Sequence, residues 1–182
     1  DALAIDRAVI AGHSGSCLTA RRVAIDHPER VAGLVLEASP TTLRFGAPVE
    51  FVNDVIAGLA DPIDPAFVRS FVADTSSEQL PPAMVDLLVA EALKVPARVW
   101  HEMFAGLIAY DDLGELDRID APTLLIWGDD DGLVSREMQN ELAQRIPHAE
   151  LVVYPGSGHT PRWDDPERFS HDLATFAHRV SA

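Results

Sequence analysis

The sequence has one cysteine, few basic residues and no long apolar run, and each shortage excludes a class of protein. Cys17 is the only cysteine among 182 residues, so a framework of internal disulfide bonds is excluded. Fourteen Lys and Arg against 29 Asp and Glu give a formal net charge of −15. A chain of that charge lacks the basic faces that bind nucleic acid or anionic membranes. No apolar run approaches the roughly 18 residues of a membrane-spanning helix.

Metal-binding and targeting signals are also missing. Seven histidines are present, but neither a His-x-x-x-His nor a Cys-x-x-Cys pattern occurs, so we expect no metal site and no cofactor. No signal peptide is visible. We expect a cytoplasmic protein of bacterial origin, with a small molecule as its partner and not a nucleic acid or a membrane.

The chain does contain an alternation of apolar strands and helices. Its length and its 47% hydrophobic composition allow one domain that buries roughly 70% of its unfolded surface. Continuous apolar runs typical of buried parallel strands lie at 7–12, 31–39, 121–128 and 149–156. Helical spacing is found from 17 to Pro28, at 135–145 and at 165–180, and residues 1–5 look like the end of another helix. The pattern predicts an α/β fold, with a parallel sheet flanked by helices.

Residues 40–120 have a different texture from both flanks. Helices are predicted at 49–59, 65–73, 82–93 and 97–109, separated by Pro- and Asp-rich turns, and no strand pattern is convincing there. We therefore expect a helical cap at 40–120, inserted between the second and third strands. Residues 1–39 and 121–182 would form the core that carries the sheet.

The first strand ends in Gly12-His13-Ser14-Gly15-Ser16 and turns at once into a helix. Such a turn forces its tip residue into a strained backbone and needs small neighbours, because strand and helix approach closely there. Gly12 and Ser16 meet this need on either side of Ser14. The Ser14 hydroxyl would be exposed at a helix N-terminus, with the Gly15 N–H directed to where an oxyanion forms.

A serine nucleophile needs a base, and the base needs an acid to orient it. Both follow later strands: Asp129, Asp130 and Asp131 come after the third strand, and His159 after the fourth. The carboxyl ends of parallel strands meet at one edge of a sheet. We therefore expect Ser14, His159 and one of these aspartates to converge there.

The motifs GHSGS, PTLLIWGDDD and YPGSGHTPRWDDPERF, in this order, resemble those of the α/β-hydrolase superfamily. The likeness is to its cap-bearing esterase, lactonase and carbon–carbon hydrolase branch, and it extends over essentially the whole chain. It implies Ser14 as nucleophile and His159 as base. It implies Asp131 as acid, because the family's acid lies three residues after the glycine that closes the seventh strand. Asp129 and Asp130 would then be a solvated acidic turn.

Two features depart from the family pattern. The usual elbow is Gly-x-Ser-x-Gly, whereas Ser16 here adds a hydroxyl beside the nucleophile. The family's first four strands, with the loop that supplies the second oxyanion N–H, have no counterpart in these residues. We expect either a longer chain or another segment to complete the sheet. The bare strand edge at 7–12 would invite pairing with a second copy or with a complementing N-terminal segment.

Several other side chains have both a functional and an ordinary interpretation. The candidates for substrate contact are His13, Trp100, Phe104, Leu107 and Trp163. His13 would otherwise be a packing residue, and the helical stripe that includes Trp100 would otherwise pack the cap onto the core. Glu37 ends the second strand, where some family members place the acid, but an ordinary strand end is the favoured interpretation.

Together these motifs predict a serine hydrolase that cleaves a small, mostly apolar carboxylic ester or lactone. Carbon–carbon bond hydrolases, perhydrolases and lyases share the same three residues and stay open as alternatives. Epoxide hydrolases and haloalkane dehalogenases of this fold use aspartate at the elbow, which argues against them here. A different class of interpretation is a catalytically impaired fragment or binding module that keeps these residues but lacks a complete oxyanion hole.

Overall fold

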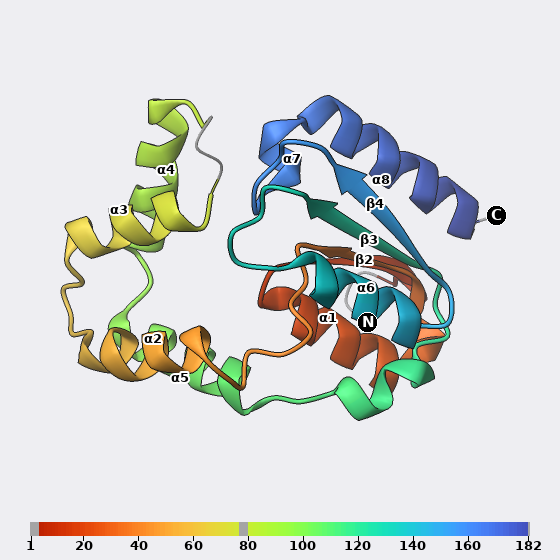
Figure 1. Ribbon diagram of the computed structural model, residues 1–182, viewed down its shortest axis with the longest axis horizontal. Helices are drawn as coiled ribbons and strands as arrows, with labels where there is room; N and C mark the ends of the chain where they lie inside the picture. Colours follow the sequence, from red (N-terminus) through yellow and green to blue (C-terminus); the bar gives the residue numbers. More distant parts are fainter. Residues whose placement is uncertain (1–3, 77–79, 182) are drawn as a thin grey trace. The chain divides into compact units, whose positions relative to one another are not determined.

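The structure is a computed structural model that describes residues 4–76 and 80–181 (Figure 1). The chain divides into two compact units. The sheet unit comprises the residues up to Thr41 and those from Asp112 onward, and the helical unit comprises Thr42–Asp111. This division differs from the predicted boundaries of 40–120, because Leu116 and Ile119 pack in the core of the sheet unit.

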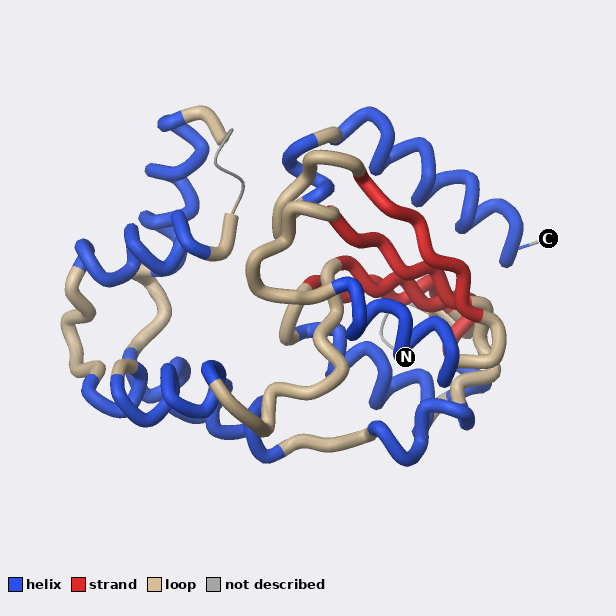
Figure 2. Tube along the Cα trace, in the orientation of Figure 1, coloured by secondary structure: helices blue, strands red, loops and turns tan. Residues whose placement is uncertain are grey.

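Four parallel strands form the sheet, which is drawn in red in Figure 2. They are β1 (Ala8–His13), β2 (Val31–Glu37), β3 (Thr123–Gly128) and β4 (Ala149–Tyr154), and they lie in that order across the sheet. β2 and β3 are buried almost throughout. A strand covered on both faces has no solvated side, which explains why their sequences are continuously apolar. The predicted α/β fold with a parallel sheet flanked by helices is confirmed.

Helices cover both faces of this sheet. On one face, α1 (Ser16–Asp26) and α6 (Arg136–Arg145) contribute side chains to the core that contains Leu34. On the other face, α8 (Pro166–Ser181) contributes to the core that contains Val35. Successive strand residues point to opposite faces. These neighbouring positions of β2 therefore belong to two different cores.

Three short elements complete the sheet unit: the 3-10 helices η1 (Pro28–Arg30) and η3 (Leu113–Arg118), and the helix α7 (Pro161–Asp164). The sequence pattern did not predict α7, because a four-residue helix is too short to show a period. A helix end was predicted at residues 1–5. The prediction is wrong for Ala4 and Ile5, which are not helical, and residues 1–3 lie outside the described part of the chain.

β1 forms one edge of the sheet. It pairs in parallel with β2 on one side, and within residues 4–76 and 80–181 no strand pairs with its other side. Its side chains are half-buried except at Ala11, which is exposed. An edge of this kind leaves backbone N–H and C=O groups open to another β-segment.

The helical unit has a core of its own. Its elements are α2 (Ala47–Asp54), the 3-10 helix η2 (Ile56–Gly58), α3 (Pro65–Asp74), α4 (Pro82–Ala92) and α5 (Ala97–Ala109). The single helix predicted at 49–59 is thus two elements, α2 and η2, separated at Val55. Trp100 is 4% exposed in this core, where its ring lies 5.1 Å from that of Phe71 and 6.2 Å from that of Phe104, centroid to centroid.

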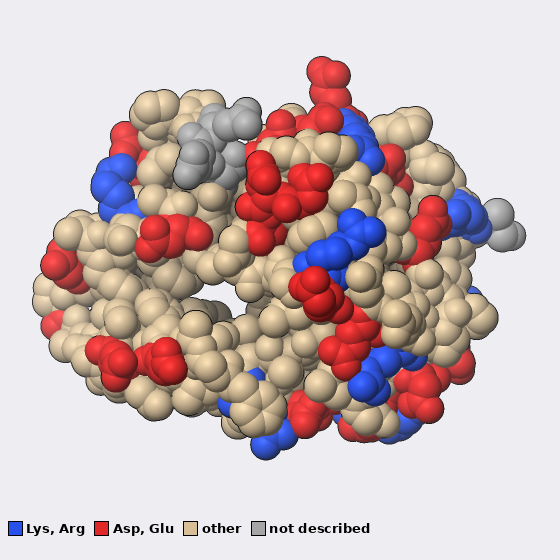
Figure 3. All heavy atoms as spheres, in the orientation of Figure 1, with Lys and Arg blue, Asp and Glu red and all other residues tan. Residues whose placement is uncertain are grey.

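Acidic and basic side chains are intermixed on the face of the molecule drawn in Figure 3. On the face drawn in Figure 3, Asp and Glu side chains are spread over both units with Lys and Arg side chains among them. The excess of acidic residues gives the net charge of −15. Within the described residues, no helix has the length and apolar character needed to cross a membrane.

Candidate active site

Ser14 lies at the tip of a tight turn between β1 and α1. Its φ angle is +53°, in the left-handed region that residues with a side chain rarely adopt. The turn is held by two backbone hydrogen bonds: Ser14 N donates to the Glu37 carbonyl at 2.9 Å, and Cys17 N donates to the Ser14 carbonyl at 3.0 Å. A Cβ on Gly12 would lie only 2.9 Å from the Cys17 Cα. The strand can therefore approach the helix only because residue 12 is glycine.

Ser16 closes the same turn with its side chain. Its hydroxyl accepts a hydrogen bond from His13 N at 2.8 Å and donates one to the His13 carbonyl, also at 2.8 Å. The serine that replaces the usual glycine therefore makes two hydrogen bonds to the strand end. Nothing in these contacts directs its hydroxyl toward the Ser14 side chain.

Gly15 lies immediately before the first residue of α1. In the described part of the chain its backbone N–H has no hydrogen-bond acceptor. The N-terminal N–H groups of a helix are unsatisfied within the helix and carry a partial positive charge. This N–H is therefore available to a developing oxyanion.

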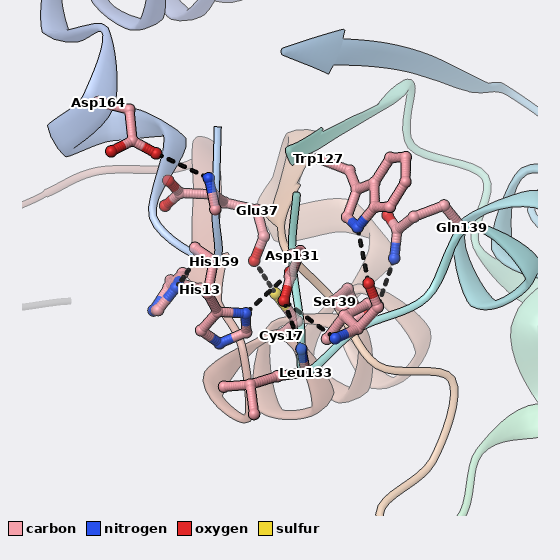
Figure 4. Close-up of polar contacts among 12 residues, drawn as sticks. His13, Cys17, Glu37, Ser39, Trp127, Asp131, Leu133, Gln139, His159 and Asp164 are labelled. Carbon is pink, nitrogen blue, oxygen red and sulfur yellow. Dashed lines mark hydrogen bonds and ion pairs between the residues drawn. The ribbon is translucent and has the colours of Figure 1, made fainter. Parts of the chain in front are cut away.

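His159 and Asp131 are hydrogen-bonded to each other, Nδ1 to Oδ2, at 2.9 Å (Figure 4). The two side chains are 5% and 0% exposed. The other carboxylate oxygen of Asp131 accepts from Leu133 N at 2.8 Å and from Val134 N at 3.0 Å. Because an ionised carboxylate only accepts, His159 Nδ1 carries the proton, and Nε2 is left to accept a proton from a nucleophile.

The two neighbouring aspartates have other contacts. Asp129 accepts a hydrogen bond from Gly156 N at 2.5 Å, and Asp130 N donates to the Ser157 carbonyl at 2.9 Å. Both are exposed. Of the three candidate acids, Asp131 is the one that contacts His159.

The loop that carries His159 lies very close to the end of β3. The end of β3 at Gly128 runs so near to the loop after β4 that a Cβ there would lie 2.2 Å from the Ser157 carbonyl oxygen. No side chain fits in that space. Glycine at this position therefore lets the loop that carries His159 lie against the end of the strand that precedes Asp131.

Ser14 and His159 are brought near each other without a direct hydrogen bond between their side chains. His13, adjacent to Ser14, has its ring centroid 4.9 Å from that of His159. No hydrogen bond joins the Ser14 hydroxyl to the His159 ring among the residues described. In ligand-free active sites the bond from nucleophile to base is often long and shortens when substrate binds. The roles of Ser14, His159 and Asp131 therefore remain a proposal.

His13 contacts the backbone of His159. Its Nε2 lies 2.9 Å from the His159 carbonyl oxygen and donates to it. Burial, and to a lesser extent the Arg162 guanidinium, lower the pKa of the His13 imidazole to about 3. The ring is therefore neutral at pH 7 and holds the loop in place. Whether it also contacts substrate stays a prediction.

The other residues predicted to contact substrate lie in two places. Trp163 is half-buried in α7, and the guanidinium carbon of Arg162 lies 4.2 Å from its ring centroid. Trp100, Phe104 and Leu107 belong to α5 of the helical unit, where Trp100 and Phe104 pack within that unit's core. A role for these four residues in substrate binding also stays a prediction.

Two ion pairs, one fully buried and one with only its carboxylate buried, were not predicted from the sequence. Glu37, interpreted as an ordinary strand end, is 3% exposed and bonded to Arg162. Its only sequence signal is an acid closing an otherwise apolar strand. Arg21 is fully buried and bonded to Asp112. Nothing in the sequence distinguishes Arg21 from Arg22 beside it, whose side chain is 29% exposed.

The structure offers few groups for a metal ion. Within the described residues, no three His, Cys, Asp or Glu side chains gather in a way that would hold one. Cys17 is fully buried, and burial raises the pKa of its thiol to about 12. Its sulfur is therefore protonated at neutral pH and packs as a small core residue.

Known proteins are similar in sequence to this chain. A 2-hydroxy-6-oxononadienedioate/2-hydroxy-6-oxononatrienedioate hydrolase from Paraburkholderia phymatum is 32% identical, over 97% of this chain and 64% of its own length. A pimeloyl-(acyl-carrier protein) methyl ester esterase from Yersinia enterocolitica is 31% identical, over 94% of this chain and 69% of its own length. The chain thus spans less than two thirds of the Paraburkholderia protein.

The fold agrees with a solved structure as well. A hydrolase from Pseudomonas aeruginosa PA01 superposes with a TM-score of 0.84 at 24% identity, covering 97% of this chain and 66% of that one. A family model described as the alpha/beta hydrolase family matches residues 1–172. This match confirms the resemblance seen in the three motifs. The chain belongs to the alpha/beta hydrolase family.

Proposed function

We propose that this chain carries the nucleophile, base and acid of a serine hydrolase acting on a small, mostly apolar carboxylic ester or lactone. The observation that carries the proposal is the 2.9 Å hydrogen bond between His159 Nδ1 and Asp131 Oδ2. It lies at the carboxyl ends of the strands, where the strained turn at Ser14 also lies. Buried and oriented as it is, this pair leaves His159 Nε2 as a base.

In the proposed reaction, the Ser14 hydroxyl oxygen attacks the substrate carbonyl carbon while His159 Nε2 takes the hydroxyl proton. Asp131 keeps the imidazole in the required tautomer and stabilises the imidazolium that forms. The Gly15 N–H donates to the oxyanion of the tetrahedral intermediate. His159 then gives this proton to the alcohol oxygen as the bond from carbonyl carbon to that oxygen breaks. In the second half, His159 Nε2 takes a proton from water as the water oxygen attacks the acyl carbon, and returns it to the Ser14 oxygen as the acid leaves.

The oxyanion site is the incomplete part of this proposal. One donor, the Gly15 N–H, is assigned, and serine hydrolases of this type use two. Loss of one donor typically slows acyl transfer by about 10²–10³-fold. We therefore expect slow turnover of activated esters by the 182-residue chain, with the Ser14 hydroxyl still reactive toward a strong electrophile.

Two relatives favour different substrates. The Yersinia protein is named as a methyl ester esterase, which supports an ester. The Paraburkholderia protein is named as a hydrolase of a 2-hydroxy-6-oxo dienedioate or trienedioate, a compound without an ester group. Hydrolysis of such a compound cleaves a carbon–carbon bond next to a ketone. Carbon–carbon bond hydrolysis by the same three residues is therefore the second candidate.

A fluorophosphonate probe tests the proposed nucleophile. We expect covalent labelling of the folded chain at Ser14, lost in Ser14→Ala and kept in Ser170→Ala, which removes an exposed serine hydroxyl in α8. Hydrolysis of p-nitrophenyl acetate should follow the same pattern. A folded chain that is not labelled at Ser14 contradicts the proposal and favours a binding module.

The two substrate classes are separated by direct assay. A panel of p-nitrophenyl esters and lactones is compared with a 2-hydroxy-6-oxo dienoate, whose loss is followed by its absorbance. The ester proposal predicts the larger kcat/KM on the first panel. A larger value on the dienoate, abolished by Ser14→Ala, would instead establish the carbon–carbon hydrolase.

A further inference from the structure

One residue at the end of β2 is bonded to both of the loops that meet at the proposed site. The backbone carbonyl of Glu37 accepts from Ser14 N at 2.9 Å. The Glu37 carboxylate accepts from Arg162 N at 2.9 Å, and from Arg162 Nη1 at 2.6 Å. Glu37 therefore joins the turn that carries Ser14 to the first turn of α7, three residues beyond His159.

The carboxylate is positioned as a fixed anchor and not as a surface charge. The Glu37 side chain is 4% exposed, whereas that of Arg162 is 26% exposed. Burial raises the pKa of Glu37, and the Arg162 guanidinium opposes that rise. A buried carboxylate has few alternative partners, so its two bonds to Arg162 constrain the backbone strongly.

The backbone of His159 is held at a second point on the same side. His13 Nε2 donates to the His159 carbonyl at 2.9 Å, and His13 precedes Ser14 directly. Asp164 adds a bond within the loop by accepting from Gly158 N at 3.0 Å (Figure 4). Residues 159–162 are therefore fixed at both ends to the strand ends that also fix the Ser14 turn.

We propose that Glu37 is a positioning residue: it sets the distance and orientation between the Ser14 hydroxyl and the His159 imidazole by clamping Arg162. This inference rests on the proposed function for its effect on rate. Asp131 orients the imidazole through Nδ1, and Glu37 sets where the whole His159 loop lies relative to the nucleophile. Glu37 does not touch substrate in this role.

The competing interpretation is an ion pair that contributes only to stability. The two interpretations differ when both partners are replaced together. Replacing a buried ion pair with apolar residues often restores stability or raises it. The hydrogen bonds from Arg162 to the Glu37 carboxylate are nevertheless lost in such a variant. A pair that only stabilises therefore predicts recovery of reactivity, whereas a positioning pair does not.

The test uses three variants of the full chain: Glu37→Gln, Arg162→Leu, and the paired replacement Glu37→Leu with Arg162→Leu. Glu150→Gln is the matched control, because Glu150 forms an exposed ion pair with Arg179 on the same unit. For each variant, the rate of fluorophosphonate labelling at Ser14 and the kcat and KM for an activated ester are measured. The free energy of unfolding is measured in parallel.

We expect the paired variant to recover stability relative to Arg162→Leu, while its labelling rate and kcat stay on the order of 10–100-fold below wild type with KM little changed. Displacements of about 1 Å cost rates of this size. Glu37→Gln keeps an acceptor for Arg162 N and should lose less. Glu150→Gln should label like wild type. A paired variant that labels as fast as wild type overturns the proposal.

A spectroscopic readout keeps this result separate from the proposed function. The His159 Nδ1 proton, bonded to Asp131, should give a downfield proton resonance in the wild-type chain. We expect Glu37→Gln and the paired variant to shift or broaden it. If the wild type is not labelled at Ser14, the proposed function fails. An unchanged resonance in the folded variants would still overturn the positioning role by itself.

Discussion

The rings of His13 and His159 lie 4.9 Å apart, and Nε2 of the first donates to the backbone carbonyl of the second at 2.9 Å. The pKa of His13 is lowered to about 3, mainly by burial. Between that value and the ordinary 6.5, the unfolded chain binds a proton at this residue and the folded chain does not. Stability contributed by neutral His13 is therefore lost as the pH falls through this window.

We predict that His13→Gln weakens this dependence, because glutamine can donate to the same carbonyl but does not titrate. One pKa unit corresponds to about 1.4 kcal/mol. Since the ring is partly exposed, we expect wild type to lose roughly 1–2 kcal/mol more than the variant between pH 7 and pH 4. Urea unfolding at several pH values measures this, with the exposed His171→Gln as control. Parallel curves for wild type and His13→Gln would contradict the prediction.

Asp131→Asn should separate orientation of His159 from the rest of the fold. An amide can donate to Nδ1, which favours the wrong tautomer of the imidazole. Loss of the acid in a serine triad in this way reduces kcat by about 10⁴-fold. The ester assay and the labelling rate check this. Asp130→Asn, an exposed neighbour, should leave both unchanged, and equal effects of the two substitutions would rule out the assigned acid.

The hydroxyl of Ser16 should contribute to the stability of the elbow. Ser16→Ala removes two hydrogen bonds to the backbone of His13. These two hydrogen bonds are exposed to water, so we expect a loss of about 1 kcal/mol in the free energy of unfolding. Ser16→Thr keeps the hydroxyl and is the control. If alanine and threonine variants are equally stable, the hydroxyl does not hold the turn.

Much of the arrangement at the sheet edge follows from the local sequence. Continuous apolar runs identify the buried strands, and a parallel sheet brings their carboxyl ends together whatever the distance along the chain. This is why Asp131 and His159, 28 residues apart, were expected as neighbours and are hydrogen-bonded. The helix predicted at 97–109 has those bounds because Pro96 precedes it and its apolar spacing is regular.

Long-range side-chain pairs could not be predicted in the same way. Glu37 and Arg162 are 125 residues apart, and Arg21 and Asp112 are 91 apart. Neither pair has a local pattern, because which charge is buried depends on where the loops pack. The break between α2 and η2 at Val55 has no proline or glycine signal at that residue either.

The open side of β1 should allow the chain to associate through backbone hydrogen bonds. We expect the chain to form dimers or larger species as its concentration rises, or to bind a peptide that supplies a further strand. Light scattering across a concentration series measures the mass. Ala11→Lys places a charge at the exposed position of this strand and should reduce association. A monomer at every concentration, in the absence of any added peptide, would contradict self-pairing.

Substitution of Arg21, which is paired with Asp112, should lower the free energy of unfolding more than substitution at an exposed ion pair. Arg21 donates to both Asp112 carboxylate oxygens, at 2.9 and 2.6 Å, and to the carbonyls of Pro40 and Thr41 at 2.9 and 3.1 Å. Residues 40–41 are where the chain leaves the sheet unit, and Asp112 is where it returns. The buried Arg21 guanidinium is therefore bonded to the chain at both points where it passes between the two units.

Arg21→Met removes that guanidinium from a buried carboxylate and from two carbonyls, and we expect a loss of roughly 3–5 kcal/mol in the free energy of unfolding. Arg21→Lys should recover only part of it, because an ammonium cannot form the two-point contact. Arg22→Met is the matched control: its partners Asp26 and Glu115 are partly exposed, so the loss should be below about 1 kcal/mol. Denaturant unfolding measures all three. Equal losses for Arg21→Met and Arg22→Met would show that burial does not make the first pair special.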